Sequence, residues 1–232
     1  MVENKIKKCV LLYSGGLDST TLLYWLSKEC GYYIYAITFL YGQKHSKELV
    51  FAKMNIAKIK NANHYILDMN WLSEFLKMGS SLILGGNEVP SLESIGVEER
   101  VQPSTYVPNR NMVFLSISAG IAECLCVDEV YYSAQAHDEY GYWDCTEDFV
   151  ERMNKVLELN RKNKIRICAP FLKLRKSEII KVGLNLGVDY SLTWSCYKGG
   201  DKACGVCPTC VERLKAFSEL GLKDPLEYEL IQ

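Results

Sequence analysis

Four cysteines in the last quarter of the chain have the spacing of a metal site. Cys196 is followed by Cys204, Cys207 and Cys210, so that two Cys-x2-Cys steps share their middle residue. Four thiolates form a closed, tetrahedral zinc site that leaves no coordination position for water or substrate. Thiolates also hold iron–sulfur clusters, so the ligand type alone allows either a zinc ion or an iron–sulfur cluster. Four independent thiols are the remaining alternative, but such clustering in a reducing compartment favours metal binding.

A second group of chemically active residues occupies 14–20, Ser-Gly-Gly-Leu-Asp-Ser-Thr, directly after an apolar run. Two glycines allow a sharp turn that brings backbone N–H groups close to an anion, and the start of the following helix adds unpaired donors. Asp18 would repel a bare phosphate, so we expect it to meet phosphates through a magnesium ion. The segment lacks the lysine of the GxxxxGK[ST] loop. The alternative is an ordinary Gly-Gly turn in which Asp18 caps the helix.

These two groups need elements to position them, and hydrophobic periodicity predicts an alternation of strands and helices. Strands are expected at 8–13, 33–40, 64–67, 129–134 and 164–168. Helices are expected at 18–30, 46–60, 111–126, 146–160 and 177–186, the third nearly uncharged and therefore expected to be buried. Strands separated by crossover helices imply an α/β fold with a mostly parallel five-stranded sheet, helices on both faces and ligands at the carboxyl ends of the strands.

Composition is that of an ordinary globular protein, with 232 residues, 48% hydrophobic and 24% charged. The longest uncharged run, 30–43, is too short to span a membrane, and the first apolar run is too short for a signal peptide, so we expect a cytoplasmic protein. The net charge of −1 lacks the basic surplus of proteins that grip nucleic acid, so no stable nucleic-acid binding is expected. Residues 160–176 hold seven basic residues and no acidic one, either a solvated edge or a local anion site.

The segment 14–19 resembles the SGGxDS loop of the N-type ATP pyrophosphatases, the PP-loop superfamily, which cleave ATP to AMP and pyrophosphate. Within it, the chain resembles the 7-cyano-7-deazaguanine synthase family, chiefly in 193–213, TWSCYKGGDKACGVCPTCVER. Further similar segments are YGQKH at 41–45, YVPNRN at 106–111, YWDC at 142–145, with tryptophan where the family usually has proline, and 170–187. The resemblance implies an adenine nucleotide alpha hydrolase-like, Rossmann-like domain over 1–190, with 79–105 as a substrate-covering loop, and a zinc-binding segment over 191–232.

The same resemblance implies an ATP-dependent carbon–nitrogen ligase. It would convert 7-carboxy-7-deazaguanine and ammonia to 7-cyano-7-deazaguanine by two rounds of adenylation, in queuosine- or archaeosine-type deazaguanine biosynthesis. The resemblance assigns ATP, bound with Mg²⁺, to Tyr13, Ser14, Gly15, Gly16, Leu17, Asp18, Ser19, Thr20, Thr21, Leu22 and Leu23. Candidates for catalysis are Asp18, Lys176, Arg110 and His137, and candidates for binding the substrate are Asp144, Asp138 and Gln43. One structural zinc ion per chain would be held by Cys196, Cys204, Cys207 and Cys210.

Simpler roles and rival functions stay open at this stage. Lys176 could form a surface salt bridge, His137 could support a loop, and either aspartate could cap the helix that starts near Thr146. A family member could stop at the amide or couple the deazaguanine to another amine. A tRNA-modifying adenylase or thiolase could use Cys124 and Cys126, and a zinc-tailed nucleotide sensor would need no catalysis. The family suggests a homodimer, and the product could enter tRNA or DNA.

Overall fold

The five segments expected to be strands form one parallel β-sheet in a computed structural model of the chain, which describes residues 6–44, 47–90, 103–136, 141–162 and 164–229. The strands are β1 (Lys8–Leu12), β2 (Tyr33–Leu40), β3 (Ala62–Asp68), β4 (Glu129–Tyr131) and β5 (Arg166–Cys168). They lie in the order β3-β2-β1-β4-β5, and all neighbouring pairs are parallel. The chain therefore leaves the central β1 in opposite directions, which places a ligand-binding crevice at the carboxyl ends of β1 and β4.

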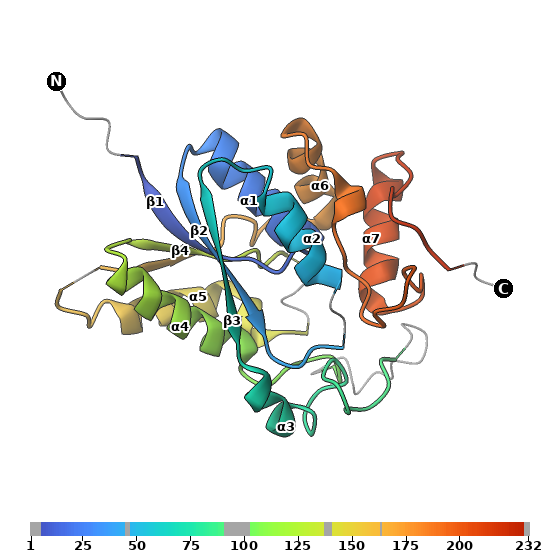
Figure 1. The fold of residues 1–232 in the computed structure, drawn as a ribbon, viewed down its shortest axis with the longest axis horizontal. Helices are drawn as coiled ribbons and strands as arrows, with labels where there is room; N and C mark the ends of the chain where they lie inside the picture. The colour runs from blue at the N-terminus through green and yellow to red at the C-terminus, as the bar shows by residue number, and fades with distance from the viewer. Residues whose placement is uncertain (1–5, 45–46, 91–102, 137–140, 163, 230–232) are drawn as a thin grey trace.

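Helices cover both faces of this sheet (Figure 1). In chain order they are α1 (Leu17–Tyr24), α2 (Lys47–Ile56), α3 (Ser73–Leu76), α4 (Arg110–Cys124), α5 (Glu147–Leu157), α6 (Lys176–Asn185) and α7 (Pro208–Glu219). Shorter helical turns are η1 (Trp25–Glu29), η2 (Asn70–Leu72), η6 (Trp143–Cys145) and η7 (Tyr190–Leu192). Apolar side chains of α1, α2 and α6 form the core on one face, and those of α4 and α5 form the core on the other. The predicted fold class is confirmed.

Three elements differ from the expectations drawn from periodicity. The first helix continues beyond α1 as the π-helix η1 instead of one regular α-helix. Only part of α4 is buried, because Met112, Ser116 and Gly120 face solvent, so the lack of charge in this helix reflects small and apolar surface residues. Helix α7 was not expected, although Pro208 in its first turn is a common start signal. Within the described ranges, no helix is long and apolar enough to cross a membrane.

A buried arginine joins the end of the chain to the α/β body. Arg213 of α7 is fully buried, and its guanidinium donates to both carboxylate oxygens of Asp224, at 2.7 and 3.0 Å. The same group donates to the backbone oxygens of Tyr190 and Thr193, in the connection that follows α6. The hydroxyl of Tyr228 donates to Asp224 at 2.6 Å. This network fixes α7 against the body and thereby sets which side of α7 faces α6.

Candidate active site and metal centre

A cavity of about 570 Å³ opens at the carboxyl ends of the strands, where the sequence predicted ligand binding. Its walls come from residues that follow β1, β2 and β4, from the starts of α1, α4 and α6, and from α7. Phe114 and Trp194 supply aromatic surface, and Asp18, Arg110 and Lys176 supply charge. An apolar cavity of this size with a few charged groups is typical of a site for a small molecule or nucleotide.

The glycine loop after β1 forms one wall of the cavity. Gly15 has a φ of +89°, a left-handed conformation that favours glycine, and a Cβ atom there would collide with the backbone oxygen of Glu48. The hydroxyl of Ser14 accepts the N–H of Gly16 at 3.1 Å and lies 3.0 Å from the hydroxyl of Ser19, so side chains brace the turn. The predicted ATP-binding residues that line the cavity are Tyr13, Ser14, Gly16, Leu17, Asp18 and Ser19. Those outside the lining are Gly15, Thr20, Thr21, Leu22 and Leu23, of which the last four are buried within α1.

Asp18 lies in the first turn of α1 without capping it. The N-cap residue is Gly16, so the alternative in which Asp18 caps this helix is wrong. Asp18 Oδ2 is 3.4 Å from Lys176 Nζ, whereas Oδ1 is buried and has no hydrogen-bond partner among the residues that the structure describes. Burial raises the pKa of Asp18, and the attraction of Lys176 offsets only part of that effect. A buried carboxylate oxygen without a partner, beside an anion-binding loop, fits the oxygen ligands that Mg²⁺ takes in proteins.

Lys176 stands at the start of α6 between two carboxylates. Its Nζ is 2.8 Å from Glu212 Oε2 as well as 3.4 Å from Asp18 Oδ2. Because Lys176 is only 8% exposed, the alternative of an ordinary surface salt bridge is wrong. Gln135, which follows β4, donates from Nε2 to Glu212 Oε1 at 2.9 Å. Glu212 was not predicted as a site residue: it lies in the segment 193–213 that resembles the family, but its type and spacing do not mark it for the cavity, and only the packing of α7 turns it toward Lys176.

The start of α4 brings Arg110 to another wall of the cavity. Burial alone would lower the pKa of Arg110, but Tyr41 and Asp144 raise it overall, so the guanidinium stays charged. Asp144 Oδ2 accepts the backbone N–H of Asn111 at 3.1 Å, in the first turn of α4. Asp144 is buried and lies outside the cavity lining, so its contact with a base stays a prediction. It does not cap α5, because Thr146 caps that helix.

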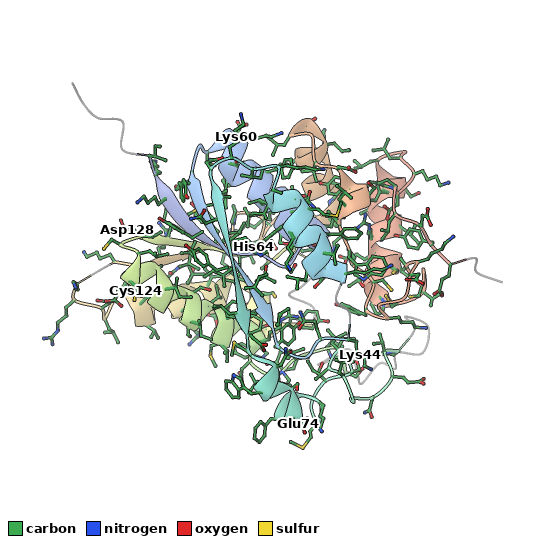
Figure 2. All side chains as sticks on the ribbon, in the orientation of Figure 1. Lys44, Lys60, His64, Glu74, Cys124 and Asp128 are labelled. Carbon is green, nitrogen blue, oxygen red and sulfur yellow. The ribbon has the colours of Figure 1, made fainter. Side chains whose placement is uncertain are left out.

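For the remaining predicted substrate-binding and acid–base residues, the structure gives less support for a role in the cavity. Gln43 lines the cavity, but its Oε1 accepts the backbone N–H of Tyr41 at 2.9 Å and its Nε2 donates to the backbone oxygen of Phe39 at 3.3 Å. His137 and Asp138 lie outside the described residues, and their roles stay predictions. His64 lies on β3 (Figure 2), outside the cavity lining, with its Nε2 2.7 Å from the hydroxyl of Thr38.

Two loops beside the cavity are held by contacts with other segments, one through side chains and one through the backbone. The tryptophan at the position where the resembled family usually has proline, Trp143, donates its indole N–H to the hydroxyl of Tyr106 at 2.8 Å. Of the predicted covering loop, 79–90 and 103–105 are described; there Leu82 lines the cavity and Ile83 pairs with Gln43 in an isolated β-bridge. Leu82 and Ile83 also belong to one apolar cluster with the four cysteines. Closure of this loop over a substrate stays a prediction.

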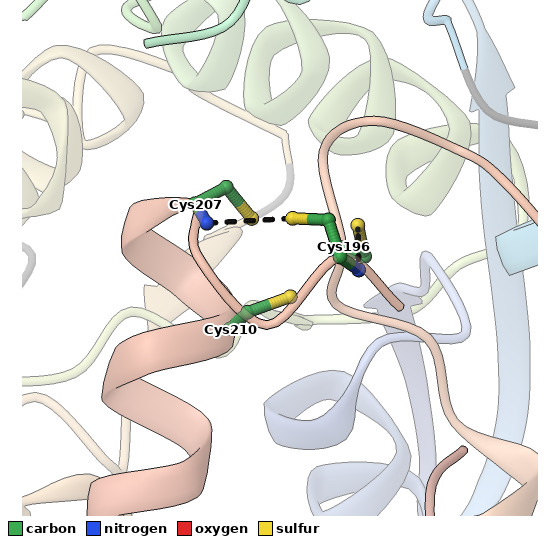
Figure 3. Close-up of side chains that lie close together, drawn as sticks. Cys196, Cys207 and Cys210 are labelled. Carbon is green, nitrogen blue, oxygen red and sulfur yellow. Dashed lines mark hydrogen bonds between the residues drawn. The ribbon is translucent and has the colours of Figure 1, made fainter. Parts of the chain in front are cut away.

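The four predicted metal ligands form one cluster. Cys196, Cys204, Cys207 and Cys210 are buried, and their sulfur atoms all lie within 4.8 Å of one another. Figure 3 shows three of these side chains directed into one space. Four sulfurs 2.3 Å from a tetrahedral zinc ion stand about 3.8 Å apart, so the cluster fits such an ion after small adjustments. Hydrogen bonding with Cys196 and Cys210 lowers the pKa of Cys207, which favours its thiolate form.

The metal centre and the glycine loop are neighbours. The backbone N–H of Trp194 donates to the oxygen of Gly15 at 3.4 Å, and its indole N–H donates to the oxygen of Cys196 at 2.9 Å. Cys207 is also the N-cap residue of α7, the helix that carries Glu212 into the cavity. The segment 194–212 therefore contacts the glycine loop at one end and lines the cavity at the other.

The chain is similar to known proteins over most of its length. A family model described as queuosine biosynthesis protein QueC matches residues 8–221. The chain is 47% identical to a 7-cyano-7-deazaguanine synthase of Caldicellulosiruptor saccharolyticus over 223 residues, 96% of each chain. It is 44% identical to that of Archaeoglobus fulgidus over 220 residues, 94% of this chain and 89% of the other. The solved structure of NMN synthetase from Francisella tularensis matches 94% of this chain and 79% of its own, with a TM-score of 0.53 and 15% identity, a likeness of fold alone.

Proposed function

The chain belongs to the QueC family of queuosine biosynthesis proteins, and from this membership we propose that it is an ATP-dependent carbon–nitrogen ligase that converts 7-carboxy-7-deazaguanine and ammonia to 7-cyano-7-deazaguanine. The observation that carries the proposal is the charged pair of Asp18 and Lys176, which lies beside the glycine loop in the cavity at the carboxyl ends of the strands. Such a pair next to backbone donors suits the cleavage of a nucleoside triphosphate.

The chemistry requires ATP because a carboxylate is a poor electrophile. In the first round, a carboxylate oxygen attacks the α-phosphorus and pyrophosphate leaves, which gives an acyl-adenylate. Ammonia then attacks the carbonyl carbon, AMP leaves and an amide forms. In the second round, the amide oxygen attacks the α-phosphorus of another ATP and pyrophosphate leaves. The nitrogen then loses its two protons and the C–O bond to AMP breaks, which gives the nitrile and AMP. One cavity serves both rounds, because each consists of adenylation followed by departure of AMP.

The residues of this chain bind and orient the reactants. Backbone N–H groups of the loop at 14–19 bind the pyrophosphate portion, as helix N-termini bind anions generally. Lys176 and Arg110 offer positive charge to the α-phosphate, where negative charge grows in the transition state. Asp18 would hold Mg²⁺, which supplies charge neutralisation for pyrophosphate. The described part of the covering loop, through Leu82, restricts access of water that would hydrolyse an acyl-adenylate.

The four-cysteine cluster is proposed to hold one zinc ion with a structural role. Four thiolates leave the ion no open position, so it cannot act on a substrate as a Lewis acid. The division into a nucleotide-binding domain, 1–190, and a zinc segment, 191–232, is part of this proposal. Arg213 of the zinc segment donates to the backbone oxygen of Tyr190, and Ala216 and Phe217 belong to the apolar core of the domain, so we expect the segment to fold against the domain and not apart from it.

A tRNA thiolase is the strongest rival among enzymes, and the positions of two cysteines argue against it. Cys124 and Cys126 lie exposed at the carboxyl end of α4 (Figure 2 labels Cys124). The first residue of that helix, Arg110, lines the cavity. Fifteen helical residues span about 22 Å. Neither thiol is therefore placed to attack a substrate activated in the cavity.

Mass spectrometry of a defined reaction tests the proposal. The purified protein is incubated with 7-carboxy-7-deazaguanine, ATP, magnesium and ammonium, and the product and AMP are quantified. We expect the nitrile with two AMP per product. The amide with one AMP would indicate a family member that stops halfway, and a different adduct when other amines are supplied would indicate a coupling enzyme. Binding of ATP without any AMP would leave only a nucleotide sensor, and omission of ammonium is the control.

A cytoplasmic homodimer completes the proposal. Val156 is 63% exposed on α5 and Leu159, just beyond it, is 79% exposed, and such apolar side chains suit a contact with a second copy. Light scattering after size-exclusion chromatography should give a mass of twice 26.4 kDa. A mass of a single chain at micromolar concentration would contradict the dimer.

A further inference from the structure

The first turns of α7, the helix that follows the metal centre, line one wall of the cavity. Cys207 is the N-cap residue of α7, Cys210 lies in its first turn, and Glu212 lies on the next turn and lines the cavity. Arg213, the following residue, is anchored to Asp224, which fixes the rotation of α7 about its axis. The metal centre and this ion pair together set where the carboxylate of Glu212 stands.

That carboxylate is bound on both of its oxygens. Oε2 lies 2.8 Å from Lys176 Nζ, and Oε1 accepts from Gln135 Nε2 at 2.9 Å. The side chain of Lys176 is 10% exposed and that of Glu212 is 30% exposed, so solvent weakens this pair less than it weakens a surface pair. Lys176 also lies 3.4 Å from Asp18, and it therefore bridges a carboxylate from α7 and a carboxylate from the glycine loop.

The bridge creates a competition at Asp18. A magnesium ion on the nucleotide, held by Asp18 Oδ1, would share this carboxylate with Lys176, which contacts Oδ2, and the two cations would repel one another. Glu212 gives Lys176 a second negative partner, so that the ammonium can release Asp18 and remain at the edge of the cavity. Without the charge of Glu212, Asp18 is the carboxylate that Lys176 contacts among the described residues, and the summed negative charge around a divalent cation falls by one.

We propose that Glu212 is a positioning residue that holds Lys176 at the cavity and lets the metal–nucleotide complex take over Asp18, so that the cysteine segment contributes to nucleotide binding as well as to folding. This inference rests on the proposed function only in so far as ATP and a divalent cation bind in this cavity. The competing view is that the contact of Glu212 with Lys176 merely fastens α7 to α6.

Equilibrium binding separates these two views. Glu212→Gln keeps the shape and a hydrogen-bond acceptor for Lys176 but removes the charge, and Glu219→Gln removes a charge from an exposed position on the same helix. Mn²⁺ binding is measured by electron paramagnetic resonance in the presence of α,β-methylene-ATP, which cannot be cleaved between its α and β phosphorus atoms. Zinc content and melting temperature are recorded for each variant, because Glu212 lies close to Cys210 in the chain.

For Glu212→Gln we expect the dissociation constant of Mn²⁺ to rise about tenfold or more, the range for partners that support a metal ligand indirectly. The KM for magnesium–ATP should rise while kcat recovers in excess magnesium, and Glu219→Gln should behave as wild type. Binding within twofold of wild type would overturn the inference and leave a structural contact. If Glu212→Gln does not fold, Gln135→Met, which removes the Nε2 donor to Glu212 Oε1 and keeps all charges, should raise the dissociation constant by a smaller factor; no change there would also overturn the inference.

These measurements stay interpretable if the proposed reaction fails. Wild-type protein that binds the analogue with Mn²⁺ but makes no nitrile would refute the proposed reaction, while the Glu212→Gln comparison would still decide this inference. Wild-type protein that does not bind the analogue at all would refute both.

Discussion

Replacement of Asp18 by asparagine separates a metal-binding role from a structural one. The side chain of Asp18 is 22% exposed, with one oxygen near Lys176 and the other buried without a hydrogen-bond partner in the described part of the chain. At 3.4 Å and an effective dielectric constant of about 20, the attraction between this carboxylate and the ammonium is about 5 kcal/mol. Burial outweighs this attraction, because the pKa of Asp18 is raised overall.

The raised pKa fixes the sign of the stability change. Asp18 binds its proton more tightly in the folded state than in the unfolded state, so its ionisation lowers the free energy of unfolding as pH rises through the acidic range. Above that range, the neutral amide removes this cost and loses about 0.3–1 kcal/mol of interaction with the N-terminus of α1. Asp18→Asn should therefore melt within about 4 °C of wild type, or higher, at pH 7 without ligands.

Activity should respond far more strongly than stability. Asp18→Asn should weaken the hold on the magnesium ion that would neutralise the departing pyrophosphate, and loss of one such preorganised interaction costs about 10²–10³-fold in rate. Pyrophosphate release at saturating magnesium is the assay, with Asp128→Asn, on the exposed stretch between α4 and β4, as the matched control (Figure 2). Turnover within about threefold of wild type would refute the metal-binding role, and a fall in melting temperature of more than about 10 °C would refute the argument from burial.

Three further changes test the metal centre and the fold. Cys207→Ser should reduce zinc from about one ion per chain to well below it and lower the melting temperature, because metal binding energy is folding energy; elemental analysis that finds iron, or no metal in wild type, would contradict this. Arg213→Met leaves Asp224 buried without its partner and should cost about 3–5 kcal/mol in urea unfolding, whereas a cost below about 1 kcal/mol would show that the ion pair does not hold α7. Thr146→Ala removes the cap that accepts from the N–H of Phe149 and should cost about 1 kcal/mol by the same measurement, with pyrophosphate release unchanged.

The local features of this protein follow from its sequence. The glycine loop, the α/β class and the cysteine cluster could all be predicted, because each depends on residue types at short spacing. A Gly-Gly pair after an apolar run forms a turn by its own backbone freedom, and Cys-x2-Cys steps bring sulfurs together within one turn of chain. The prediction that the helix at 111–126 is buried was wrong in part. A lack of charged residues can result from burial or from a surface of small and apolar residues, and Met112 of α4 faces solvent.

The partners of the charged side chains were decided only by the tertiary structure. Glu212 meets Lys176 because α7 packs on α6 in a rotation fixed by Arg213, and no local pattern encodes that rotation. Asp144 likewise contacts the start of α4 instead of the nearby α5, because η6 turns its carboxylate toward the preceding helix. Contacts between residues distant in sequence depend on strand order and on helix packing, which short-range periodicity does not specify. The sequence by itself therefore determined the glycine loop and the four cysteine ligands, whereas the packing of α7 and α4 determined which charged side chains face one another.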